Sequence, residues 1–234
     1  MTVTYSYRDP ERLLLTEDRR AVVGCLNRSL DLCREVLPGP REVSFDIVVT
    51  NGENSKTFPV EGAGAGNEIT IYLDAKQPIY RSPGQHHFIT SAVAHEWHHL
   101  VRDCGFMNGK TLGHILVSEG LALAFEVQLL GRVPYAARAV PRKRLLLLED
   151  QMKVLSRQRD TYSNIKVLTG GRGTHLHRWF GYSFAYALVN GWLEREAKTP
   201  VEAVDVKANK ILRPWRNSSL SVVGSSSFIK NTCS

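Results

Sequence analysis

Hydrophobic residues recur along this chain with two different periods. Between residues 10 and 37 they return at spacings of three and four, which predicts a helix that ends at Pro38-Gly39-Pro40. Over 42–50 and 67–74, apolar and β-branched residues partly alternate with polar ones, which predicts two strands. The GAGAG stretch at 62–66 lies just before the second strand, and we expect it to be a flexible connection.

The second half of the chain keeps the helical period. It predicts helices over 86–103, 111–131 and 141–159, a loop over 169–175, and a further apolar helix from about residue 180. Strands early in the chain and helices later predict an α+β fold with its small sheet in the N-terminal half.

Length and tail composition predict the domain organisation. The 234 residues are enough to bury a sizeable core. We expect one domain over 1–214, followed by a poorly ordered tail over 215–234, because the tail is rich in Ser and Asn. The oligomeric state cannot be read from the sequence.

The charge balance is basic, with 30 Lys and Arg against 23 Asp and Glu, or +7. The charges are spread along the chain, and the densest basic cluster, Arg142 to Arg144, is soon followed by Glu149 and Asp150. A solvated, mildly basic surface is therefore favoured over a nucleic-acid site. No apolar run approaches the length of a membrane span, and the N-terminus lacks the layout of a secretory signal. We expect a cytoplasmic protein with no nucleic-acid or membrane partner.

The stretch SAVAHEWHHLVRD, residues 91–103, places three histidines and a glutamate within five positions. Residues four apart nearly eclipse on a helix, so His95 and His99 point the same way, one turn apart. Glu96 stands about 100° round the helix from His95. This is the HExxH pattern, in which two neutral imidazoles hold Zn²⁺ and the glutamate is the general base. His98 could also pair with His95, but Glu96 would then have no role, so we predict His99 as the ligand.

The third ligand decides the class of site. The metzincin continuation of HExxH needs a glycine and a histidine where this chain has Arg102 and Gly105, so that class is excluded. Further along, Glu119 lies on an apolar helical stripe with Leu112, Leu116 and Leu123. A carboxylate there is costly to bury unless it is paired or bound to a cation.

A short turn between two antiparallel helices would bring Glu119 opposite His95 and His99. The sequence therefore predicts one Zn²⁺ per chain, held by His95, His99 and Glu119. Glu126, two turns beyond Glu119, is the alternative ligand. Three protein ligands leave a fourth position open, which is typical of a catalytic rather than a structural zinc.

Three stretches together resemble a known family. HEWHHLVRD, GKTLGHILVSEGLALAF and GYSFAYALV are similar to segments of the predicted zinc-dependent metallopeptidases of the gluzincin type, a domain of unknown function. The resemblance spans roughly residues 42–212, with Ala185 where the family has glycine. It implies a zincin-like fold, in which the small N-terminal sheet packs on the HExxH helix and the C-terminal half is mainly helical. It also implies peptidase chemistry on a peptide or protein substrate.

Such an enzyme needs a second donor for the developing oxyanion. Gluzincins often use a downstream Tyr or His, and the resemblance points to Tyr182, for which a half-buried helix aromatic is an equal alternative. His175 and His177 are further candidates, although surface histidines are the simpler interpretation. Asp103 could orient a ligand histidine or be a plain surface residue. The strand at 67–73 could align an extended substrate by edge pairing.

We therefore predict a zinc-dependent hydrolase, a metallopeptidase in which Glu96 and Tyr182 are catalytic. The alternative is a basic binding protein without activity, which contacts nucleic acid or another acidic partner. That protein would lose affinity steeply with salt and would not depend on Glu96. A third possibility, a zinc-holding protein without turnover, is disfavoured because Glu96 is present.

Overall fold

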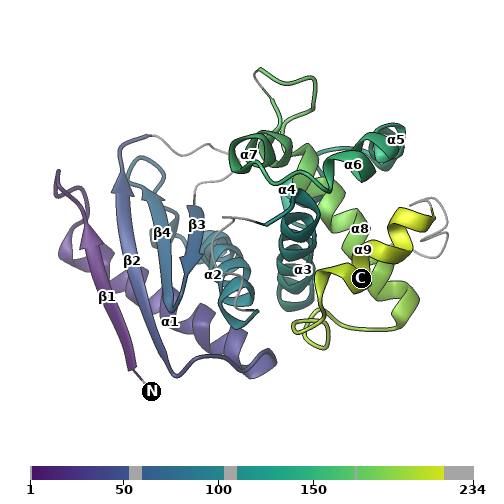
Figure 1. The fold of residues 1–234 in the computed structure, drawn as a ribbon. Coiled ribbons are helices and arrows are strands. Elements are labelled where there is room, and N and C mark those ends of the chain that lie inside the picture. Colours follow the sequence, from purple (N-terminus) through teal and green to yellow (C-terminus); the bar gives the residue numbers. More distant parts are fainter. Residues whose placement is uncertain (1, 53–59, 103–109, 172, 219–234) are drawn as a thin grey trace, which may run out of the picture. The chain divides into compact units, whose positions relative to one another are not determined.

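The computed structural model describes residues 2–52, 60–102, 110–171 and 173–218 (Figure 1). The chain groups into two compact units: unit 1 is Met1–Met107 with Phe125–Tyr135, and unit 2 is Asn108–Ala124 with Ala136–Ser234.

Unit 1 contains a four-stranded sheet in the order β1-β2-β4-β3, covered by helices (Figure 1). Strands β1, β2 and β4 are parallel to one another, and β3 runs antiparallel to β4 at one edge. Helix α2 packs against both β3 and β4, as well as against α1. The elements are β1 Thr2–Arg8, α1 Thr16–Val36, β2 Glu42–Thr50, β3 Val60–Ala65, β4 Glu68–Asp74, the short 3₁₀ helices η1 Ile79–Arg81 and η2 Pro83–Gln85, and α2 His86–Val101.

Strand β2, inside the sheet, has a row of buried apolar side chains at every second position. Val43, Phe45 and Ile47 are almost completely buried, and the neighbouring strand β4 buries Ile69 and Ile71 in the same way. Side chains two apart share one face of a strand, so this sheet presents a continuous apolar face to the rest of unit 1.

The N-terminal segment contains a strand that was not predicted, and the predicted start of the first helix was wrong. Residues 2–8 form β1, whose polar and aromatic side chains alternate between exposed and half-buried positions. The first helix begins at Thr16 rather than near residue 10, because the carboxylate of Asp9 accepts hydrogen bonds from the amides of Leu13 and Leu14. Those bonds close a turn in which Arg12 has a positive φ of 53°.

The GAGAG segment is also different from its prediction. It forms most of β3, which pairs with β4 from Val60↔Leu73 to Ala65↔Glu68. The segment forms a strand although glycine has a low strand propensity, because the main-chain hydrogen bonds to β4 do not depend on side chains. Because β3 takes the edge, β4 is paired on both sides, and the strand at 67–73 is not free for the edge pairing that the sequence left open.

Unit 2 is helical in the part that the structure describes. The expected helix over 141–159 is two helices, because the chain bends at Leu148, whose φ and ψ are −107° and 8°. Helices α7 and α9 were not predicted. The elements are α3 Leu112–Leu130, α4 Tyr135–Arg138, α5 Arg142–Leu147, α6 Glu149–Leu155, α7 Thr161–Thr169, α8 Phe180–Glu196 and α9 Ala208–Asn217.

Helix α3 runs through both units, since residues 125–130 belong to unit 1. By length and composition it could cross a membrane, and 78% of its most apolar window is buried in the fold. The expectation that no apolar run reaches this length was therefore wrong, although such burial is typical of a core helix.

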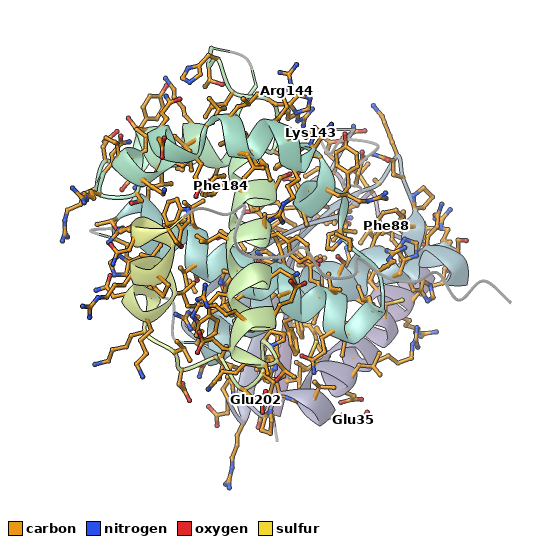
Figure 2. All side chains as sticks on the ribbon, turned by 90° about the vertical axis from the view of Figure 1, so that its right-hand side faces the viewer. Glu35, Phe88, Lys143, Arg144, Phe184 and Glu202 are labelled. Carbon is orange, nitrogen blue, oxygen red and sulfur yellow. The ribbon has the colours of Figure 1, made fainter. Side chains whose placement is uncertain are left out.

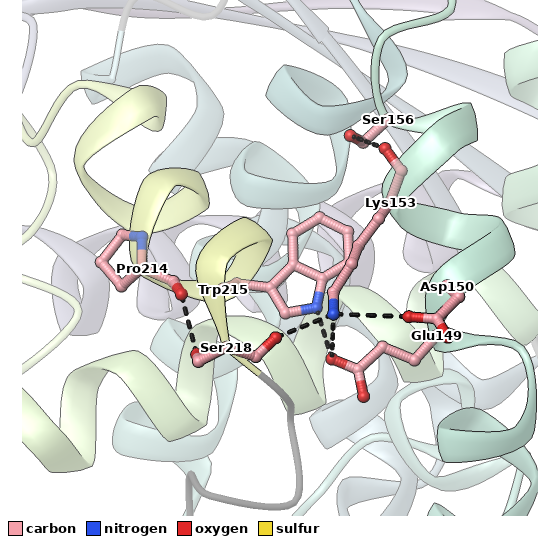
Figure 3. Close-up of polar contacts among 7 residues, drawn as sticks. All are labelled: Glu149, Asp150, Lys153, Ser156, Pro214, Trp215 and Ser218. Atoms are coloured by element: carbon pink, nitrogen blue, oxygen red, sulfur yellow. Dashed lines mark hydrogen bonds and ion pairs between the residues drawn. The ribbon is translucent and has the colours of Figure 1, made fainter.

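The core of unit 2 includes Phe184 of α8 (Figure 2), whose ring lies edge-on to that of Trp215 at 5.6 Å. The indole of Trp215 donates a 3.0 Å hydrogen bond to Glu149 of α6 (Figure 3). Lys153 of α6 donates to the carbonyl oxygen of Ser218 at 2.8 Å, which ties the end of α9 to α6. Ordered structure thus continues past residue 214, and residues 219–234 lie outside the described part of the chain.

The predicted α+β class is confirmed. A small mixed sheet lies in the N-terminal half and packs on the helix that carries HExxH, and the C-terminal half is mainly helical. The domain boundaries stay a prediction.

Candidate metal centre

Helix α2 is anchored in unit 1 by the tryptophan of HEWHH. Trp97 is completely buried, and its indole nitrogen donates a 2.9 Å hydrogen bond to the carbonyl oxygen of Leu37. A Cβ at Gly39 would lie 2.8 Å from Cη2 of Trp97, so only glycine leaves room for the indole there. The turn that ends α1 therefore also holds the histidine-bearing helix in place.

His95 and His99 lie on one side of α2, as their spacing predicted. Their ring centroids are 4.8 Å apart, with the rings inclined by 76°. Both side chains are half-buried, so they are accessible to a small ligand while being held by the fold.

Glu126 of α3 orients the first histidine. Its Oε1 lies 2.7 Å from Nδ1 of His95, and its Oε2 accepts a hydrogen bond from the hydroxyl of Ser91. In the tautomer that fits this contact, Nδ1 of His95 carries the proton and donates to the carboxylate. Nε2 then keeps its lone pair, the arrangement in which a neutral imidazole binds a metal ion. Glu126, the alternative ligand in the sequence analysis, is thus placed as the partner of His95.

Glu119 completes a group with the two histidines. One ligand atom each from His95, His99 and Glu119 lies within 4.8 Å of the others. Glu119 is only 9% exposed, and burying a carboxylate is unfavourable unless a cation or hydrogen bonds compensate. Two imidazole nitrogens and one carboxylate oxygen are the donor types that zinc takes in three-ligand sites.

His98 has a different environment. It is completely buried, and its ring centroid lies 5.7 Å from that of Phe125. Among the described residues it is not part of the group that could hold an ion. The choice of His99 over His98 as a ligand stays a prediction.

Glu96, the expected general base, lies against strand β3. A Cβ at Gly62 would be 2.8 Å from Cγ and 3.0 Å from Oε1 of Glu96, and a Cβ at Gly64 would be 3.0 Å from Oε2. The two glycines therefore let the strand backbone approach this carboxylate, which is 7% exposed. Sequence reasoning missed this contact. The signal was the spacing of two, which places both glycines on one face of a strand.

The glycine that follows Glu119 has a packing role in unit 2. A Cβ at Gly120 would lie 2.8 Å from the carbonyl carbon of Ala185 and 2.5 Å from Cγ2 of Val189. Glycine is therefore needed for α3 to approach α8 this closely. Ala185, where the family has glycine, is completely buried.

The predicted oxyanion donors are in unit 2. Tyr182 is half-buried in the first turn of α8, with its ring 5.6 Å from that of Trp179. His175 and His177 are exposed, as expected of surface histidines. The role of Tyr182 stays a prediction, and Asp103 lies outside the described residues.

Comparison with known proteins identifies the family. The model of a family described as "Predicted Zn-dependent protease (DUF2268)" matches residues 22–213. The chain belongs to this family. No curated protein matches it. Among solved structures, it is similar to an aminopeptidase N family protein from Idiomarina loihiensis, with 14% sequence identity and a TM-score of 0.43. The similarity covers 92% of this chain and 39% of that protein, so the chain spans well under half of the neighbour's length.

Proposed function

We propose that this protein is a zinc-dependent metallopeptidase that cleaves peptide bonds in a peptide or protein substrate. The observation that carries the proposal is the group of His95, His99 and Glu119, whose ligand atoms lie within 4.8 Å of one another. Membership of a family described as zinc-dependent proteases supports it.

The residues fit one zinc ion per chain. His95 would bind through Nε2, because Glu126 engages its Nδ1. His99 and Glu119 would supply the second nitrogen and the carboxylate oxygen. When bound, zinc supplies a Lewis acid that polarises a carbonyl group and makes a water molecule more acidic.

The chain's own residues would handle the protons. Glu96 is the proposed general base, which takes a proton from the attacking water and later passes it to the departing amine. The close backbone of β3 limits the positions that its side chain can adopt. Tyr182 is the proposed donor to the oxyanion that develops on the substrate.

Strand β3 is the proposed guide for the substrate. It lies at the edge of the sheet, antiparallel to β4, and it passes directly beside Glu96. An extended peptide that pairs with an edge strand gains main-chain hydrogen bonds regardless of its sequence. This would hold a peptide bond next to the proposed base.

Metal content and turnover test the proposal separately. We would purify the wild type, Glu119→Ala and Glu96→Gln without chelator and measure the zinc bound per chain. We expect about one zinc in the wild type and in Glu96→Gln, and clearly less in Glu119→Ala. Turnover of a peptide library should then be lost in Glu96→Gln despite its zinc.

A wild type that binds no zinc after reconstitution would refute the metallopeptidase. A basic binding protein would then be the better interpretation, and salt-sensitive binding to an acidic partner that is unchanged in Glu96→Gln would support it.

A further inference from the structure

Helices α5 and α6 of unit 2 each have a buried side and an exposed side. Buried positions recur at Leu145, Glu149, Met152 and Ser156, at spacings of three and four. The exposed positions recur with the same spacing on the other side. They are Lys143, Arg144, Leu147, Asp150, Gln151, Val154 and Arg157.

Two of these exposed side chains are large and apolar. Leu147 is 81% exposed and Val154 is 73% exposed, the highest values for large hydrophobic residues in the described part of the chain. Tyr162 and Ile165 of the next helix, α7, are exposed as well. Large apolar side chains as exposed as Leu147 and Val154 are candidates for an interaction site.

The same region holds most of the chain's excess positive charge. Between Arg138 and Lys166 there are eight Lys and Arg against three Asp and Glu, an excess of five where the whole chain has +7. Lys143 and Arg144 project from α5 at the surface of unit 2 (Figure 2). Along the sequence, the segment that contains α5 and α6 therefore carries most of the net positive charge.

The acidic residues of this region are engaged within unit 2. Glu149 is buried and accepts the hydrogen bond from Trp215 (Figure 3). Asp150 lies 3.5 Å from the ammonium group of Lys153. Asp160 caps the N-terminus of α7, where it accepts a hydrogen bond from the amide of Ser163. The exposed positions of α5 and α6 thus carry three cations (Lys143, Arg144 and Arg157), two large apolar side chains and one exposed carboxylate, that of Asp150, which is near Lys153.

We propose that Lys143, Arg144, Leu147, Val154 and Arg157, here called the basic-apolar face, bind the surface of a bilayer that contains anionic lipids. Cations reach lipid phosphates while neighbouring apolar side chains enter the boundary of the acyl chains. This is the same combination of side chains that α5 and α6 expose.

The apolar side chains favour a lipid surface over the other acidic partners. A nucleic acid would use the cations and leave Leu147 and Val154 in water. These two side chains lie on different helices, on either side of the bend at Leu148. A fluid bilayer accepts separate protrusions without a matching pocket, whereas a protein partner needs a pocket for each. The inference goes beyond the proposed function and is independent of it.

Co-sedimentation of the full chain with lipid vesicles tests the proposal. The vesicles would contain either equimolar phosphatidylglycerol and phosphatidylcholine or phosphatidylcholine alone. Two double variants are compared with the wild type. The cation variant carries Lys143→Ala and Arg144→Ala, and the apolar variant carries Leu147→Ser and Val154→Ser. We expect binding to the anionic vesicles alone. The cation variant should bind roughly 25-fold more weakly, since each cation near the surface contributes about fivefold. The apolar variant should bind roughly tenfold more weakly.

Matched controls use exposed residues elsewhere. Lys207→Ala with Lys210→Ala removes two exposed cations near α9, and Leu32→Ser removes an exposed leucine of α1. Both should keep wild-type binding within about twofold. Thermal unfolding and zinc content should be unchanged in all variants, so a folding defect would be seen directly.

Several results would overturn the proposal. One is absence of binding to the anionic vesicles. A second such result combines two observations: the apolar variant binds the vesicles as well as the wild type does, and the protein binds a single-stranded oligonucleotide unless the cations are removed. The face would then be a general binding site for polyanions. A third is a wild-type dimer that the apolar variant dissociates, which would make the face a contact between two copies of the chain.

Discussion

Removing the carboxylate of Glu126 should weaken zinc binding although Glu126 is not a proposed ligand. Its Oε1 lies 2.7 Å from Nδ1 of His95, and its Oε2 accepts a hydrogen bond from Ser91. In Glu126→Ala, His95 would lose the acceptor that fixes its tautomer and ring orientation. Partners of this kind are worth about 10- to 100-fold in metal affinity. A loss of that size corresponds to about 1.4 to 2.8 kcal/mol in the free energy of zinc binding.

Competition with a chromogenic zinc chelator, at constant pH, measures this effect without a substrate. We expect the affinity for zinc to fall in the order wild type, Ser91→Ala, Glu126→Gln, Glu126→Ala and Glu119→Ala. Glutamine keeps a carbonyl oxygen that can accept from Nδ1, and the hydroxyl of Ser91 donates to the carboxylate of Glu126 rather than to His95. Wild-type affinity in Glu126→Ala would refute the reasoning. A loss larger than that of Glu119→Ala would instead make Glu126 a ligand.

Three further predictions concern two close glycine contacts and one ion pair. Gly62→Ala should abolish peptide hydrolysis while zinc content stays at the wild-type level, because a Cβ 2.8 Å from Cγ of Glu96 must displace that side chain. Gly120→Ala should lower the free energy of unfolding by about 1 to 3 kcal/mol in urea titration, because its Cβ would overlap the backbone of α8. The pKa of Asp18 is lowered mainly by its hydrogen bonds from Arg81, so Arg81→Ala should lower the free energy of unfolding above pH 4. That difference should shrink as the pH falls below the ordinary aspartate value of 3.8, since the stabilising carboxylate becomes protonated.

For each of these three predictions, a control variant or a contradicting result can be named. Ala63 lies on the exposed side of β3, so Ala63→Ser should leave hydrolysis unchanged. If Gly62→Ala hydrolyses peptides normally, β3 does not constrain the proposed base. Gly24 lies inside α1 with only the end of a flexible arginine nearby, so Gly24→Ala should stabilise the protein by about 0.5 to 1 kcal/mol. An effect of Arg81→Ala that is constant from pH 3 to 7 would show that the ion pair with Asp18 contributes nothing.

Local periodicity predicted the elements whose own residues specify them. Helix α2 and strand β2 lie close to their predicted bounds, because each carries an apolar face of the right period. Strand β1 was missed because its apolar side chains are few and only half-buried. Strand β3 was missed because glycine has little strand propensity, and its pairing partner lies outside the segment.

The sequence by itself determined the geometry of HExxH, because the pitch of a helix places His95 and His99 on one side wherever that helix lies. It also pointed to Glu119, since a carboxylate on an apolar stripe needs a partner. Only the tertiary structure decided that Glu126 orients His95 and that the glycines of β3 lie against Glu96. Each of these contacts joins residues about thirty positions apart, and no local pattern encodes which distant segment will pack against a helix.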